Sequence, residues 1–272
     1  MPVAFAQDPA CRPSVSMTGM AGSVRCLTED DMTWLNSLSY GSGGWGDELL
    51  HGLGVTLALA IATFPFAVVL SFLIHWAKVS RYAPVRLFGR AYTTVFKSLP
   101  EILTLLILYY QSQAIVSWLV GVIAPGSHVS ISPFVAGMMS LAFVISAYGS
   151  EVVRGALNAV GKGQFEAAAS LGLSPTHAFF KVILPQLWRH AIPGFGNLWV
   201  ILLKDTSLVS VITLFELTHV ASMAINTTRQ PFLFFGLIAV IYVLLVTVST
   251  RAQKQLEKRV SRGFTREENG DA

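Results

Sequence analysis

Long stretches of this 272-residue chain contain no charged side chain. Asp, Glu, Lys and Arg are all absent from residues 49–77, 102–150 and 230–250. A helix needs about 20 predominantly apolar residues to cross the hydrocarbon core of a bilayer. These windows therefore predict membrane-spanning helices rather than the core of a soluble domain.

The second window is long enough for two crossings, and the turn sequence Pro-Gly-Ser-His at 125–128 divides it. A further apolar stretch over 191–215 is interrupted only by Lys204 and Asp205. We therefore expect an all-α polytopic membrane protein with five transmembrane helices. These helices are predicted near 53–76, 102–123, 131–150, 191–213 and 231–250.

Composition agrees with this class, because only 12% of the residues are charged and 53% are hydrophobic. Soluble domains carry about 25% charged residues.

Fifteen Lys and Arg residues fall in the segments 77–98, 151–190 and 251–272, and three fall on the opposite side. Short basic segments stay in the cytoplasm, so we expect the N-terminus outside and the C-terminus inside. The net charge of +4 reflects this bias, and no basic patch with interleaved aromatic residues suggests a nucleic-acid partner.

Three parts follow from this topology: a periplasmic N-terminal segment over 1–48, a transmembrane domain over 49–250 and a basic cytoplasmic tail over 251–272. The only cysteines, Cys11 and Cys26, both lie in the N-terminal segment. On an oxidising side of the membrane they could form a disulfide, or they could remain two idle thiols. The tripeptide Ala-Phe-Ala at 4–6 lacks a preceding apolar core, so we do not expect a signal peptide.

The loop over 151–190 has the local signals of two short helices. Residues 164–171 form an amphiphilic pattern that ends at Gly172, the residue type that best tolerates a left-handed C-terminal position. Ser174 and Pro175 then suit the N-cap and first position of a second helix. We expect these two short helices to form a rigid cytoplasmic projection, which we call the knob. Its small side chains, Ala167, Ala168 and Ala169, would allow another protein to approach closely.

This loop also carries a recognisable pattern. Glu166-Ala-Ala, three residues, Gly172, nine residues and then Val182-x-Leu-Pro185 resembles the E-A-A loop of ABC importer permeases. The sequence Leu203-Lys-Asp-Thr-Ser-Leu208 is similar to a signature of the polar amino-acid branch of that family. The resemblance covers about residues 52–251. Pro-Glu-Ile-Leu at 100–103 is closest to permeases for histidine, lysine, arginine, ornithine and opines, although the Lys-Ser-Leu at 97–99 departs from the usual Arg-Gly pattern.

The resemblance implies a type I ABC importer permease of the bacterial inner membrane, which carries a polar amino acid by alternating access. Its knob is expected to dock on a separate ATP-hydrolysing subunit. The implied coupling residues are Gly163, Gln164, Glu166, Ala167, Ala168, Gly172 and Pro185. The implied partners are an ATPase dimer, a second permease subunit, a periplasmic amino-acid-binding protein and membrane lipid.

We expect no cofactor on this chain, because ATP and magnesium belong to the partner ATPase. A phosphate-binding P-loop needs two glycines with four residues between them, and the second glycine is followed by Lys and a hydroxyl residue. In the nearest sequence the spacing between Gly155 and Gly161 is five residues, and Gly163 stands where the hydroxyl is needed.

Polar residues inside the predicted membrane helices are candidates for the translocation path. They are Lys204, Asp205, Thr206, Ser207, Tyr109, Tyr110 and Gln111. The alternative is that these groups only join helices, as polar side chains in membrane bundles often do.

Two other function classes compete with the importer. A passive channel or scaffold fits five apolar helices but has no use for the E-A-A knob. An intramembrane enzyme needs a nucleophile and a base within the bundle, yet the histidines lie at predicted helix edges or in loops, and neither H-E-x-x-H nor G-x-S-x-G occurs. We therefore expect no catalytic residue and no metal site.

Overall fold

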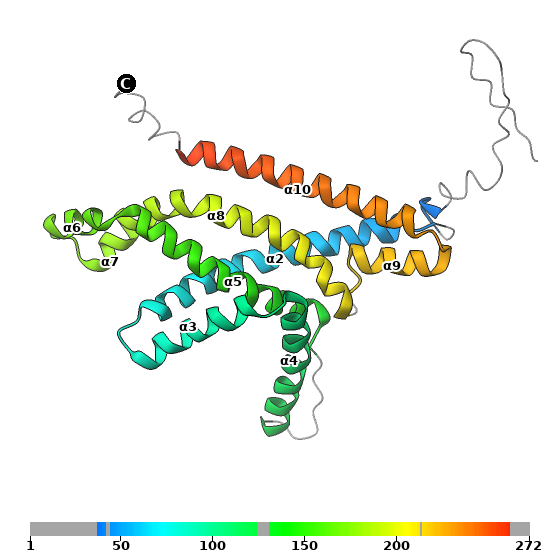
Figure 1. The fold of residues 1–272 in the computed structure, drawn as a ribbon, viewed down its shortest axis with the longest axis horizontal. Coiled ribbons are helices and arrows are strands. Elements are labelled where there is room, and N and C mark those ends of the chain that lie inside the picture. Colours follow the sequence, from blue (N-terminus) through cyan, green and yellow to red (C-terminus); the bar gives the residue numbers. More distant parts are fainter. Residues whose placement is uncertain (1–36, 42–43, 124–130, 213, 262–272) are drawn as a thin grey trace, which may run out of the picture.

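The computed structural model describes residues 37–41, 44–123, 131–212 and 214–261, and all regular elements within these ranges are helical (Figure 1). The predicted all-α class is therefore confirmed for this part of the chain. Cys11, Cys26 and the turn at 125–128 lie outside the described residues. The elements are α2 (Gly46–Val79), α3 (Ala83–Ser98), α4 (Glu101–Ile123), α5 (Pro133–Val160), α6 (Lys162–Ser170), α7 (Pro175–Ala178), a π-helix η1 (Phe179–Ile183), α8 (Leu184–Asp205), a 3₁₀ helix η2 (Thr206–Ile212), α9 (Leu217–Thr228) and α10 (Pro231–Ser261).

Four helical stretches are long and apolar enough to cross a membrane: α2, α5, the stretch from α7 through η2, and α10. The count becomes five if α3 and α4, which are bent by 119° where they meet, form one broken span. The sequence pattern assigned the second crossing to residues 102–123 alone, so the bend between α3 and α4 was not predicted.

Helices extend beyond the charge-free windows in several places. Most of the segment 77–98, expected as a connecting loop, is the helix α3, and α9 fills part of the connection before α10. The helices α5 and α10 run about ten residues past their predicted ends. Charged residues can continue a helix once it leaves the hydrocarbon, so a charge-free window marks only its apolar part. The 34 residues of α2 accordingly span about 51 Å, against about 30 Å for the hydrocarbon core.

The main core lies where α2, α5 and α8 pack together. Leu59, Leu187 and Leu202 are fully buried there. Gly149 lets α5 approach α2 so closely that an added Cβ would collide with the Ser71 hydroxyl. A Cβ added to Gly137 of α5 would lie 2.8 Å from a methyl group of Val209. A second, smaller core joins the start of α2 to α9 and α10.

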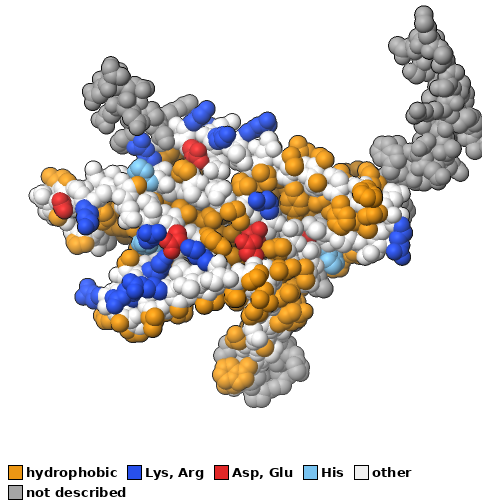
Figure 2. Space-filling model, viewed as in Figure 1, with side chains coloured by type: hydrophobic (Ala, Val, Ile, Leu, Met, Phe, Trp, Pro, Cys, Tyr) orange, Lys and Arg blue, Asp and Glu red, His pale blue; other side chains and the backbone are white. Residues whose placement is uncertain are grey.

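The surface fits a bilayer. Figure 2 shows hydrophobic side chains over much of the visible face, while Lys and Arg gather mainly toward the end of the bundle that holds α6 and the α2–α3 turn. In α10 only 11% of the most apolar window is buried inside the chain, and Phe232 is 94% exposed. An apolar helix left this open requires lipid or another protein subunit around it.

Candidate coupling segment and translocation path

The predicted knob is a capped helical turn at the end of α5. The backbone of Gly161 (φ +76°) separates α5 from α6, and α6 ends before Gly172 (φ +72°). The N–H of Leu173 donates to the carbonyl of Ala168 at 3.2 Å, and the N–H of Gly172 donates to that of Ala169 at 2.9 Å. This pair of bonds is the Schellman motif, which satisfies the last carbonyls of a helix. The predicted end of this helix at Gly172 is confirmed.

The second part of the knob also follows its sequence signals. Ser174 is the N-cap of α7, where its hydroxyl accepts a hydrogen bond from the N–H of His177 at 3.4 Å, and Pro175 is the first helical residue. The chain then continues without interruption through η1 into α8, which has Pro185 in its first turn. The knob is therefore connected rigidly to a helix that reaches into the bundle.

A side-chain bond joins the two ends of the knob. Gln186 donates from Nε2 to Oε1 of Gln164 at 3.1 Å, and it also donates to the carbonyl of Val182 at 3.0 Å. This links the start of α6 to the start of α8. Gln164 is one of the implied coupling residues, and the structure gives it a bracing role within the chain itself.

The knob presents most of the predicted coupling residues to its surroundings. Gly163, Gln164, Glu166, Ala167, Gly172 and Pro185 are all exposed. Leu171 at the tip is 80% exposed, so this large apolar side chain is open to a partner surface. Ala168 is different: it is only 2% exposed, because it packs inside the knob. The expectation that Ala168 offers a contact surface was wrong, and Ala167 and Ala169 remain open.

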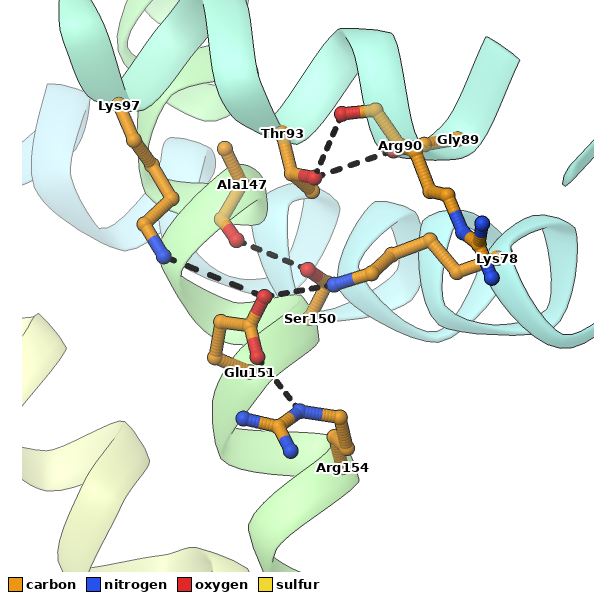
Figure 3. A network of polar contacts seen from close by, with 9 residues as sticks. All are labelled: Lys78, Gly89, Arg90, Thr93, Lys97, Ala147, Ser150, Glu151 and Arg154. Carbon is orange, nitrogen blue, oxygen red and sulfur yellow. Dashed lines mark hydrogen bonds and ion pairs between the residues drawn. The ribbon is translucent and has the colours of Figure 1, made fainter. Parts of the chain in front are cut away.

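A charged hub is centred on Glu151 of α5, about 15 Å before the end of that helix (Figure 3). The carboxylate of Glu151 accepts a hydrogen bond from Lys78 Nζ at 2.6 Å and from Arg154 Nε at 2.7 Å. Lys97 Nζ lies 3.9 Å from the same carboxylate. These ion pairs connect α2, α3 and α5. We did not single out Glu151 from the sequence, although it is the first charge after the long charge-free window.

The predicted path residues at 204–207 lie where α8 tightens into η2. Lys204 is exposed and Asp205 is half-buried. Thr206 is fully buried, and its hydroxyl donates to the carbonyl of Leu203 at 2.7 Å. Ser207 likewise donates to the carbonyl of Lys204 at 2.7 Å. Both hydroxyls therefore bond to the backbone of their own helix, whereas the two charged side chains do not.

The remaining candidates lie on α4, further from this point. Glu101 at the start of α4 is near enough to Asp205 for the two carboxylates to repel each other. Tyr109 is eight residues further along α4, which corresponds to about 12 Å. Its ring contacts that of Tyr110, with the centroids 5.3 Å apart, and the side chain of Gln111 is exposed. The fold therefore brings Glu101, not the tyrosines, to the Lys204–Asp205 pair.

One more acid inside the bundle was missed. Glu216 is fully buried, and its carboxylate accepts hydrogen bonds from the N–H of His219 at 2.8 Å and from the hydroxyl of Thr56 at 3.3 Å. It is the N-cap of α9, a position that acids favour. Its neighbours are polar but uncharged, so it serves the junction of α2 and α9 rather than an open path.

Comparison with known proteins agrees with this architecture. Residues 68–262 match the family described as binding-protein-dependent transport system inner membrane component. The nopaline transport system permease protein of Agrobacterium fabrum is 37% identical over 84% of this chain and 98% of its own length. The arginine ABC transporter permease protein of Haemophilus influenzae is 35% identical over 79% of this chain and 93% of its own.

A solved structure has the same fold. It is described as the crystal structure of an amino acid ABC transporter with histidines, and it is 30% identical to this chain, with a TM-score of 0.67. The match covers 79% of this chain and 95% of that one. Together these similarities extend over most of the sequence. The chain therefore belongs to the binding-protein-dependent transport system inner membrane components, the permease subunits of ABC importers.

Proposed function

We propose that this chain is the amino-acid-translocating permease of an ATP-driven importer in the bacterial inner membrane, and that the knob formed by α6 and α7 couples it to a separate ATPase dimer. The observation that carries this proposal is an exposed, internally braced knob at the basic end of the bundle. Its tip offers Glu166 and Leu171, and neither side chain is used to hold the chain's own fold.

The charge distribution supports a cytoplasmic location for the knob. Basic segments of polytopic proteins remain on the cytoplasmic side, and the hub cations Lys78, Lys97 and Arg154 belong to the basic segments 77–98 and 151–190. ATP is available on that side. A movement of the docked knob would be transmitted through η1 to α8, because these helices are continuous.

The substrate class follows from the relatives and from the charges near the centre of the bundle. The matched permeases are named for nopaline and for arginine. In this chain Glu101 and Lys204 are both near enough to Asp205 to act on it electrostatically. Two carboxylates and one ammonium group suit a solute that carries both charge signs with an excess of positive charge. We propose a basic amino acid or an opine-like derivative, delivered by a periplasmic binding protein and carried by alternating access between this chain and a second permease subunit.

Substitution of Gly172 tests the coupling role. Gly172 has φ +72°, where a side chain is strained by about 1–2 kcal/mol, although an added Cβ would meet no atom within 4 Å. Gly172→Val should therefore distort the knob without disturbing the membrane core. We expect uptake of the amino acid into proteoliposomes to be abolished, while membrane insertion stays normal.

Gly155→Val is the matched control. Gly155 also has open space around its Cβ position, but it lies within α5 and its φ is not positive. This variant should transport at close to the wild-type rate. Normal uptake by Gly172→Val, or equal loss in both variants, would contradict the proposal that the shape of the knob is required.

A further inference from the structure

A cavity of 760 Å³ lies at the junction of α2, α5 and α6. Its polar lining comes from His75 of α2, Arg154 and Asn158 of α5 and Lys162 of α6. Its apolar lining comes from Val79, Leu157 and Phe165. The cavity therefore lies between the membrane bundle and the knob, and it is distinct from the Lys204–Asp205 region.

The charge around this cavity is strongly positive. Lys78, Lys97 and Arg154 all share one carboxylate, that of Glu151 (Figure 3). Arg154 uses only Nε for that ion pair, and its terminal nitrogens make no hydrogen bond with any described residue. Lys162 is exposed and makes no ion pair within the described part of the chain. Two cationic side chains thus line a cavity that contains no acid.

A buried nitrogen behind the wall of this cavity lacks a partner. His75 is 5% exposed, and its Nδ1 atom has no hydrogen-bond partner among the described residues. Leaving such a group unpaired costs about 1–3 kcal/mol. The Nδ1 atom itself is closed to solvent, so a ligand in the cavity would lie against the His75 side chain without bonding to this atom.

The backbone contributes a further attraction for negative charge. The helix α6 begins at Lys162, and its N-cap Gly161 has no side chain to accept hydrogen bonds from the first N–H groups. Both residues line the cavity. The free N–H groups and the helix dipole at such an end favour an anion.

We propose that this cavity is a binding site for a phosphate oxyanion, held by Arg154, Lys162 and the first N–H groups of α6. The same chemistry is available from free phosphate and from the headgroup of an anionic phospholipid. The apolar wall formed by Val79, Leu157 and Phe165 suits the phospholipid, because its acyl chain could contact this wall while its headgroup binds the neighbouring cations. A bound oxyanion would brace the angle between α5 and α6.

The first experiment uses the full chain in nanodiscs of zwitterionic lipid, with inorganic phosphate as the probe. Phosphate should raise the thermal unfolding midpoint in a saturable manner, and chloride at equal ionic strength should not. Lys162→Gln should weaken the apparent phosphate affinity by about tenfold, since it removes one charge-assisted hydrogen bond. Lys254→Gln, which removes an exposed cation outside the cavity, should leave the affinity unchanged.

The second experiment adds phosphatidylglycerol to the nanodiscs and counts retained lipid by native mass spectrometry. A phosphate response that depends on Lys162 supports the site with free phosphate as its ligand. A retained phosphatidylglycerol that depends on Lys162, without a phosphate response, supports it with a lipid ligand. The proposal is overturned if neither ligand binds, or if Lys162→Gln and Lys254→Gln respond alike. Lys162 and Lys254 are both exposed, so neither substitution should disturb folding. Both readouts are independent of transport.

Discussion

Two glutamates fifteen residues apart show how differently this chain uses the hub and the knob. Glu151 in the hub is in contact with Lys78, Lys97 and Arg154 and connects three helices. Glu166 in the knob is exposed, and its carboxylate makes no hydrogen bond or ion pair with any other described residue. The hub acid is committed to the fold, whereas the knob acid is available to a partner.

The stabilising interactions of the two regions differ in the same way. The hub depends on contacts between residues far apart in the chain, such as Lys78 and Glu151. The knob is stabilised mainly by local bonds, namely the Schellman motif around Gly172 and the cap at Ser174. A region built from local bonds can keep its shape while its outer face remains open for docking. Removing one interaction from each region tests this difference between the hub and the knob.

The largest effect on stability is expected from Glu151→Gln. It leaves Lys78, whose side chain is only 13% exposed, without its partner at 2.6 Å. Breaking a charged pair of this partly buried kind should cost about 2–3 kcal/mol. The matched variant Glu166→Gln should change stability by less than about 0.5 kcal/mol, because the side chain is exposed. Thermal unfolding midpoints in nanodiscs would rank the two variants, and an equal loss in both would refute the distinction between hub and knob.

A smaller, local effect is expected from Ser174→Ala. The hydroxyl caps α7 and accepts from the N–H of His177, and loss of such a cap costs about 1 kcal/mol. Hydrogen exchange at the amides of α7 should accelerate, while the amides of α5 near Glu151 should be unchanged. Thr176→Ala is the control, since its hydroxyl is exposed and caps no helix. Unchanged exchange in α7 would show that the knob does not depend on this local cap.

The sequence predicted the knob well because its signals are local. The glycine with positive φ, the Ser N-cap and the following proline each act within about five residues, so they can be recognised from adjacent letters. The hub was not predicted, since Lys78 and Lys97 meet Glu151 only after α2, α3 and α5 pack together. The proximity of Glu101 and Asp205 has the same origin.

The transmembrane helices were predicted only in part, and the reason is related. Apolar windows report the hydrocarbon environment, and they correctly located the interiors of α2, α5, α8 and α10. They say nothing about an amphipathic helix that carries charge, so α3 was taken for a loop. The 119° bend at α4 was missed as well, because its direction depends on packing rather than on composition.

The most direct test of the coupling role is transport by Glu166→Gln in the importer reconstituted with its ATPase and binding protein. We predict that membrane insertion and basal ATP hydrolysis stay normal, while amino-acid uptake and its associated ATP hydrolysis fall by about tenfold or more, as expected for loss of a central interface contact. The same substitution at Glu257 on α10 should have no effect. Wild-type uptake by Glu166→Gln would contradict the claim that the knob couples this permease to ATP hydrolysis.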